Sequence, residues 1–189
     1  GRSGLQLPLC HHVAVMCRAL SPSQFLEGCA KFVIPALQHL LCNHVKRVNE
    51  KANKVLCFFL TKTAFSAALA SNARFCEMVL IKYWQEGVRH QHQKIRGATA
   101  QQLACFLQYW LASESVLCSQ AVSFLKAVVK CLLCDSGTLA RTEALNIYKI
   151  LEQAYPQQMA KFFESLDPTS KKKITLSGTS NARPLRKPI

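Results

Sequence analysis

Basic side chains at the starts of predicted helices are the residues of this sequence whose type and spacing could do chemistry. Lys46, Arg47, Lys94, Arg96 and Arg141 lie at or near the start of apolar, helix-like stretches that recur about one helical hairpin apart. Positive charge at a helix N-terminus opposes the helix dipole, so this placement weakly favours a binding role over that of ordinary solvated helix starts. If the odd-numbered corners of stacked hairpins share one edge, the five residues form a row that suits an elongated acidic surface.

Other residue types give no comparable signal for catalysis. The ten acidic residues form no paired acid/base arrangement, and no Gly-rich phosphate loop, His-Glu helix motif or nucleophile elbow occurs. Cys131-x-x-Cys134 is the one zinc-like pair, whereas a structural zinc site needs four ligands, usually with a second pair at suitable spacing. The prediction is therefore a protein that is not an enzyme and holds no metal or cofactor.

Two aromatic pairs resemble base-stacking residues, but their positions favour another role. Tyr83-Trp84 and Tyr109-Trp110 each lie late in a helix-like stretch and continue its apolar period. Core packing, with the polar tips of the rings near the surface, is the interpretation that this period favours.

The charge of the chain indicates an acidic partner. The 189 residues include 24 Lys and Arg against 10 Asp and Glu, a formal net charge of +14. Six of the basic residues and one acid follow Leu166, so the preceding part is itself strongly basic. Nucleic acid, an anionic membrane and an acidic protein surface are the partner classes compatible with such an excess.

Apolar patterning places the chain in a reducing, aqueous compartment. The apolar runs are interrupted by lysines before they reach the length of a membrane span, and no secretory signal pattern opens the sequence. Most of the ten cysteines lie among apolar neighbours, where a free thiol acts as a small hydrophobe. We expect a cytoplasmic location and, because the sequence starts without Met, a fragment of a longer protein.

The elements that must position the basic residues are predicted to be helices. Apolar periodicity and breaks at Pro, Gly and polar corners predict eight of them, over Leu7–Leu20, Ser23–Cys42, Val48–Thr63, Asn72–Glu86, Gln93–Ala112, Ser115–Cys134, Leu139–Ala154 and Gln157–Leu166. Antiparallel pairs with a period of about forty residues are typical of HEAT-type repeats, and no strand pattern competes. The predicted fold is an all-α, HEAT-like solenoid of stacked hairpins.

The last predicted hairpin marks the end of the folded domain, which we expect to cover residues 1–167. Pro156 separates two apolar stripes, one of Ala144, Ile147, Tyr148, Leu151 and Ala154, the other of Met159, Phe162, Phe163 and Leu166. Residues 168–189 are poor in apolar side chains and are predicted to form a disordered tail or linker. The tail could make an auxiliary contact with an acidic polymer through Lys171, Lys172, Lys173, Arg183, Arg186 and Lys187.

The same segments resemble the TOG domains of the CLASP type, a family of HEAT-repeat microtubule-associated proteins. The final repeat matches in an arginine-bearing corner, an alanine, a tyrosine, a proline and a closing Leu-Asp, here Arg141, Ala144, Tyr148, Pro156 and Leu166-Asp167. Two earlier corners are similar, one with Lys46, Arg47 and Val48 before Ala52, the other with Ile95 and Arg96. The opening Arg2, Ser3, Leu5 and Cys10 resemble the end of a second corner, so the resemblance implies a domain that lacks the first repeat.

The resemblance implies a noncatalytic domain that binds tubulin or microtubules and regulates microtubule dynamics. Its basic corners would face the acidic surface of tubulin through Lys46, Arg47, Lys94, Arg96 and Arg141. Two other functions stay open. A general HEAT scaffold would bind another protein through an apolar or mixed groove, and a basic solenoid could bind nucleic acid, although no recognised nucleic-acid module supports that third function.

Overall fold

The computed structural model describes residues 3–19, 31–69, 83–112, 117 and 119–178. Every regular element in these ranges is a helix. The helices are α1 (Ser3–Ala19), α3 (Lys31–Leu40), α4 (Lys46–Leu69), α6 (Gln93–Ala112), α7 (Ser119–Leu133), α8 (Thr138–Ala154), α9 (Pro156–Glu164) and α10 (Pro168–Gly178). Residues 83–88 are also helical.

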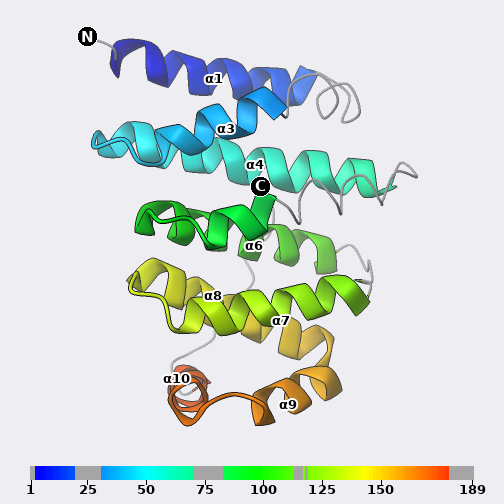
Figure 1. Ribbon diagram of the computed structural model, residues 1–189. Coiled ribbons are helices and arrows are strands. Elements are labelled where there is room, and N and C mark those ends of the chain that lie inside the picture. The colour runs from blue at the N-terminus through cyan, green and yellow to red at the C-terminus, as the bar shows by residue number, and fades with distance from the viewer. Residues whose placement is uncertain (1–2, 20–30, 70–82, 113–116, 118, 179–189) are drawn as a thin grey trace.

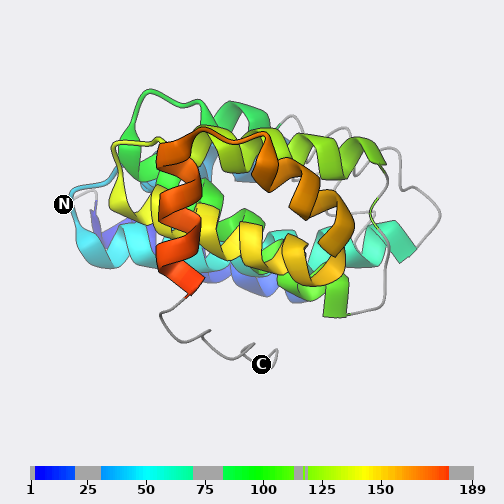
Figure 2. The ribbon, with the colours of Figure 1, turned by 90° about the horizontal axis from the view of Figure 1, so that it is seen from below.

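The helices stack in one direction as a HEAT-like solenoid, which confirms the predicted fold class. Helices α1, α4, α6 and α8 contact one another in succession, while α3 pairs with α4 and α7 pairs with α8 (Figure 1). Seen from below, α9 and α10 lie over the end of this stack (Figure 2). One continuous cluster of buried apolar residues runs through it, as expected when each hairpin buries its apolar face on the next.

The predicted hairpin at the end of the stack is present. Ala144, Ile147, Tyr148 and Leu151 are buried on one face of α8, whereas Ala154, also expected in that stripe, is exposed. Pro156 occupies the first turn of α9, where its missing N–H costs no helical hydrogen bond. On α9 and just beyond it the residues that are buried are Met159, Phe162 and Leu166, with Phe163 partly buried against them.

The helical residues 83–88 approach α6 closely. A Cβ atom built on Gly87 would lie 2.5 Å from Oγ1 and 2.6 Å from Cγ2 of Thr99, so only glycine fits this contact. The hydroxyl of Tyr83 donates to Oε1 of Gln102 at 2.7 Å, and Nε2 of Gln102 donates to Oδ1 of Asn53 on α4 at 2.9 Å. This buried polar chain fixes the register of three neighbouring helices.

The prediction of disorder after residue 167 is wrong for residues 168–178, which form α10. Oδ1 of Asp167 accepts the backbone N–H of Ser170 at 3.0 Å and so caps the helix. Ile174 is buried, and the ammonium groups of Lys173 and Lys149 donate to the carbonyl oxygens of Leu133 and Ser177, respectively. Hydrogen bonds from lysines to backbone carbonyls thus hold α10 against the solenoid. Its few apolar residues do not by themselves predict that it packs there. Residues 179–189 lie outside the described residues.

Candidate functional site

Three corners of the solenoid lie at one edge of the stack. They are residues 41–45 before α4, residues 89–92 before α6 and residues 134–137 before α8, here named corner one, corner two and corner three. Because α4, α6 and α8 are side by side and run in the same direction, their N-termini follow one another along this side, at the left in Figure 1. We refer to this side as the corner edge. Each of the five basic residues selected from the sequence lies at one of the three corners or in the following first turn.

Three of these five basic side chains extend into solvent. Lys46 has a side chain that is 87% exposed, and Arg47 and Lys94 are also exposed. Lys46 forms an ion pair with Glu50 at 3.8 Å, one turn further along α4. Such an exposed pair contributes little to stability, so the lysine can exchange it for another partner.

Arg96 is held inside the edge, where it joins corner two to corner three. Its side chain is 15% exposed, and its Nε and Nη2 atoms donate to Oδ2 and Oδ1 of Asp135 at 2.5 and 3.0 Å. The remaining terminal nitrogen, Nη1, donates to the backbone carbonyls of His90 and Gln91, both at 2.9 Å. The guanidinium of Arg96 therefore stabilises the turn of corner two and at the same time binds the carboxylate of Asp135 in corner three.

Arg141 performs a similar task within corner three alone. Its Nη1 donates to the backbone carbonyls of Asp135 and Ser136 at 2.7 and 2.8 Å, and its Nη2 donates to the hydroxyl of Thr138 at 3.2 Å. Only part of this side chain reaches solvent. The five predicted residues thus divide into an exposed set, Lys46, Arg47 and Lys94, and two arginines that shape the corners.

Asp135 is the acidic residue on which both arginines converge, and sequence reasoning did not select it. Its Oδ1 accepts the backbone N–H of Gly137 at 2.7 Å as well as the bond from Arg96, and its side chain is 6% exposed. Burial by itself would raise the pKa of Asp135, but the hydrogen bonds from Arg96 and Gly137 and the charges of both arginines outweigh it and lower that pKa. The same bond raises the pKa of Arg96, so the pair is ionised at neutral pH.

The lowered pKa of Asp135 predicts a loss of stability in acid. A carboxylate with a depressed folded-state pKa stabilises the fold above its unfolded pKa of about 4, and this contribution is lost as the pH falls through the folded value. Wild-type protein should therefore lose more of its unfolding free energy between neutral and strongly acidic pH than a D135N variant. Urea unfolding followed by circular dichroism across that range measures the difference, and parallel curves would contradict the role of this carboxylate.

The basic residues of the predicted tail are partly used to hold α10. Lys171 donates to the carbonyl of Glu164 at 2.9 Å and lies over the ring of Phe163, and Lys173 bonds to α7 as described above. Lys172 is exposed. A contact of 3.9 Å between Cys134 Sγ and Ser170 Oγ places the start of α10 beside corner three. Arg183, Arg186 and Lys187 lie outside the described residues.

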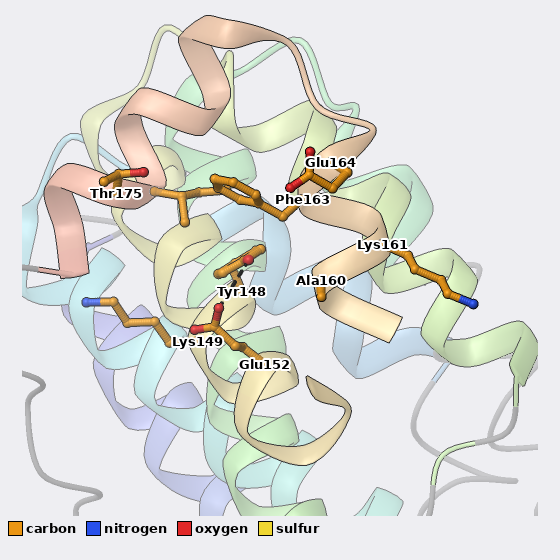
Figure 3. A pocket seen from close by; sticks show the side chains of 9 residues that line it. Tyr148, Lys149, Glu152, Ala160, Lys161, Phe163, Glu164 and Thr175 are labelled. Atoms are coloured by element: carbon orange, nitrogen blue, oxygen red, sulfur yellow. Dashed lines mark hydrogen bonds between the residues drawn. The ribbon is translucent and has the colours of Figure 1, made fainter. Parts of the chain in front are cut away.

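A surface hollow of about 590 Å³ lies between α8, α9 and α10, as Figure 3 shows. Its polar groups do not converge on the interior. The hydroxyl of Tyr148 donates to Glu152 at 3.2 Å, Lys149 is bound to a backbone carbonyl of α10, and Lys161 points away from the hollow. Burial, followed by the charge of Glu152, raises the pKa of Tyr148 to about 12, so the phenol stays protonated.

The remaining candidates from the sequence are accounted for by packing or lie on the surface. Tyr83 and Trp84 are buried, as the core-packing interpretation predicted, and Trp84 and Trp110 flank the ring of Phe106 with centroids at 4.8 and 5.5 Å. Cys131 and Cys134 are exposed free thiols. Across the described ranges, no cluster of three or more His, Cys, Asp and Glu residues has a metal-binding arrangement, and no helix has the length and hydropathy for a membrane span.

Comparison with known proteins connects this geometry to a family. The family model described as CLASP N terminal matches residues 1–175, which is nearly the whole sequence and includes all three corners and most of α10. No curated protein matches the sequence.

Proposed function

The chain belongs to the CLASP N-terminal family of cytoplasmic, microtubule-associated and noncatalytic proteins, and from this premise we propose that its corner edge docks on the acidic surface of tubulin. The observation that carries the proposal is the exposure of Lys46, Arg47 and Lys94 at corners that follow one another along one side of the solenoid. Their charges are spread over two corners, so they match an extended acidic surface better than a small anion.

The two arginines of corners two and three contribute to this docking surface indirectly. Arg141 and Arg96 use most of their donors to close corner turns, so they hold the surface in shape and supply a positive potential close to it. The three exposed residues would supply direct contacts. Binding through such contacts regulates microtubule dynamics if the edge favours one arrangement of tubulin over another.

The test of this function is co-sedimentation of the 189-residue chain with stabilised microtubules over a salt series. Contacts between exposed charges are screened by salt, because the Debye length shortens from about 10 Å at 0.1 M to about 3 Å at 1 M. The affinity should therefore fall steeply as salt is added, and a nucleic-acid oligomer should compete no better than polyglutamate of equal charge. Salt-independent sedimentation would contradict electrostatic docking, and much stronger competition by the oligomer than by polyglutamate would favour a nucleic-acid function instead.

A second candidate function, a scaffold for another protein, is favoured by α1. This helix exposes Leu9, Val15 and Met16, with 48%, 47% and 40% of their surfaces accessible, and it lies at the end of the stack opposite α10. Exposed apolar side chains gathered on one helix are typical of a protein contact rather than of a nucleic-acid surface. The two functions use different parts of the molecule and are compatible.

A further inference from the structure

Asp135 has a charge that opposes the proposed function, since it adds a carboxylate to an edge that would bind an acidic surface. By Coulomb's law alone, removing this charge should strengthen the binding. The contacts around the residue lead to the opposite expectation. We propose that Asp135 is a positioning residue for the corner edge, so that its loss weakens the binding of tubulin; this inference rests on the proposed function.

The first step of the argument is the set of donors that Asp135 receives. It accepts two bonds from Arg96 on α6 and one from the backbone N–H of Gly137 in its own corner. Bidentate pairing of a guanidinium with a carboxylate fixes both distance and orientation. Residues 39 positions apart are thereby joined, and this carboxylate links corner two directly to corner three.

The second step connects this bond to a residue that is free to contact tubulin. The guanidinium of Arg96 also binds the carbonyls of His90 and Gln91, which form the turn directly before α6. Lys94 lies in the first turn of the same helix and is exposed. Without the carboxylate of Asp135, Arg96 loses its ionic partner and holds the turn of corner two less firmly. Lys94 then becomes more mobile in the free protein, and the binding of tubulin must supply the free energy that orders it.

The third step is the location of the Asp135 charge relative to a partner. Its side chain is 6% exposed and surrounded by donors from Arg96 and Gly137, and Arg141 lies beside it. The negative charge is therefore compensated locally and contributes little repulsion at the surface. The carboxylate of Asp135 fixes the position of the Arg96 guanidinium between two corners, which outweighs the single charge that it introduces.

Glu50 offers a matched control. It is also acidic and close to the corner edge, but its side chain is 55% exposed and pairs only with Lys46 in the described contacts, at 3.8 Å. The variants E50Q and D135N make the same change in charge and in side-chain chemistry. If charge alone decides the affinity, both substitutions strengthen binding. If Asp135 positions the edge, the two substitutions change the affinity in opposite directions.

The experiment measures the affinity of the full 189-residue chain for stabilised microtubules at fixed low salt. We expect E50Q to bind about twofold more tightly, as for the loss of one exposed charge. We expect D135N to bind about three- to tenfold more weakly, the cost of ordering one or two side chains on binding. The variant D135E keeps the charge and should recover part of the affinity.

Two further variants separate positioning from general instability and from direct contact. I147V removes one buried methyl group of α8 away from the corners, so it lowers stability but should bind like wild type. R96K keeps the positive charge but loses the forked donor, and it should weaken binding about as much as D135N. The double variant R96K/D135N should be no weaker than either single variant, because both remove the same interaction.

The outcomes distinguish this inference from the function on which it rests. Tighter binding by D135N, in parallel with E50Q, would overturn the positioning role and leave tubulin docking intact. Additive losses for R96K and D135N would assign Arg96 to direct contact and would also overturn it. If wild-type protein does not sediment with microtubules, or does so without dependence on salt, the proposed function fails first. Circular dichroism confirms that each variant is folded at the temperature of the assay.

Discussion

Reversing the three exposed charges of the corner edge, in the variant K46E/R47E/K94E, is expected to abolish co-sedimentation with microtubules. Each substitution replaces an attraction to the acidic surface with a repulsion, and like charges placed against one another at an interface cost several kcal/mol. We expect an affinity at least about 100-fold lower, which is beyond the range of a sedimentation assay. The variant tests direct contacts with tubulin, because the side chains of these three residues do not stabilise the corner turns.

The fold should tolerate these substitutions. All three residues lie in the first turns of α4 and α6, where negative charge interacts favourably with the helix dipole. The unfavourable term is the like-charge pair that forms between position 46 and Glu50, which costs only a few tenths of a kcal/mol. The melting temperature of the variant should therefore stay within a few degrees of the wild-type value, as thermal circular dichroism can show.

A control with the same change in net charge separates the edge from the rest of the surface. K54E/K126E/K161E reverses three lysines that lie on α4, α7 and α9, outside the three corners and the first turns that follow them. It should lower the affinity much less than the corner variant, since only long-range attraction is reduced. Equal losses for the two triple variants would show that net charge, rather than the corner edge, determines binding.

The second large effect concerns stability, at the contact between residues 83–88 and α6. Replacing a helical glycine with alanine ordinarily stabilises a protein by up to about 1 kcal/mol. At Gly87 we expect the opposite, a loss of about 2 kcal/mol, because the added methyl group would overlap both γ atoms of Thr99 and force the helices apart. Urea denaturation of G87A gives the unfolding free energy directly.

Thr99 provides the complementary variant for a double-mutant cycle. Its hydroxyl is buried and has no hydrogen-bond partner among the described residues, so T99A alone should cost little beyond the small cavity that it leaves. In G87A/T99A the new methyl group can occupy that space. We expect a favourable coupling of about 1–2 kcal/mol between the two substitutions. Additive effects, or a stabilising G87A, would contradict the close contact between these helices.

Much of the fold could be predicted because its determinants are local. The bounds predicted for Gln93–Ala112 are those of α6, and Pro156 separates α8 from α9 where the two apolar stripes indicated a break. Helix α4 continues to Leu69, past the predicted end at Thr63, through a segment that contains no Gly or Pro. Helix α10 was missed because its burial depends on one isoleucine and on lysines that reach carbonyl groups of other helices.

The composition of the corner edge could be predicted, but the roles of its residues could not. The sequence pattern near a helix start does not distinguish a basic residue that is exposed, such as Lys94, from one that is hydrogen-bonded inside a corner, such as Arg96. The difference arises from Asp135, which lies one hairpin later and approaches Arg96 only when α6 and α8 stack. Contacts between repeats depend on how the helices pack against one another, and the apolar periodicity of a single helix does not predict that packing. Tubulin docking by these residues stays a prediction.

The packing of Trp84 and Trp110 against the ring of Phe106 determines what tryptophan fluorescence can report about this protein. These are the two tryptophans of the chain, and both lie against the same phenylalanine in the middle of the solenoid. Their emission therefore reports on the centre of the stack, whereas α10 contains no tryptophan or tyrosine and is spectroscopically silent. A fluorescence melt would record native emission from molecules whose last helix had already detached, so amide hydrogen exchange is the observable that follows that end of the solenoid.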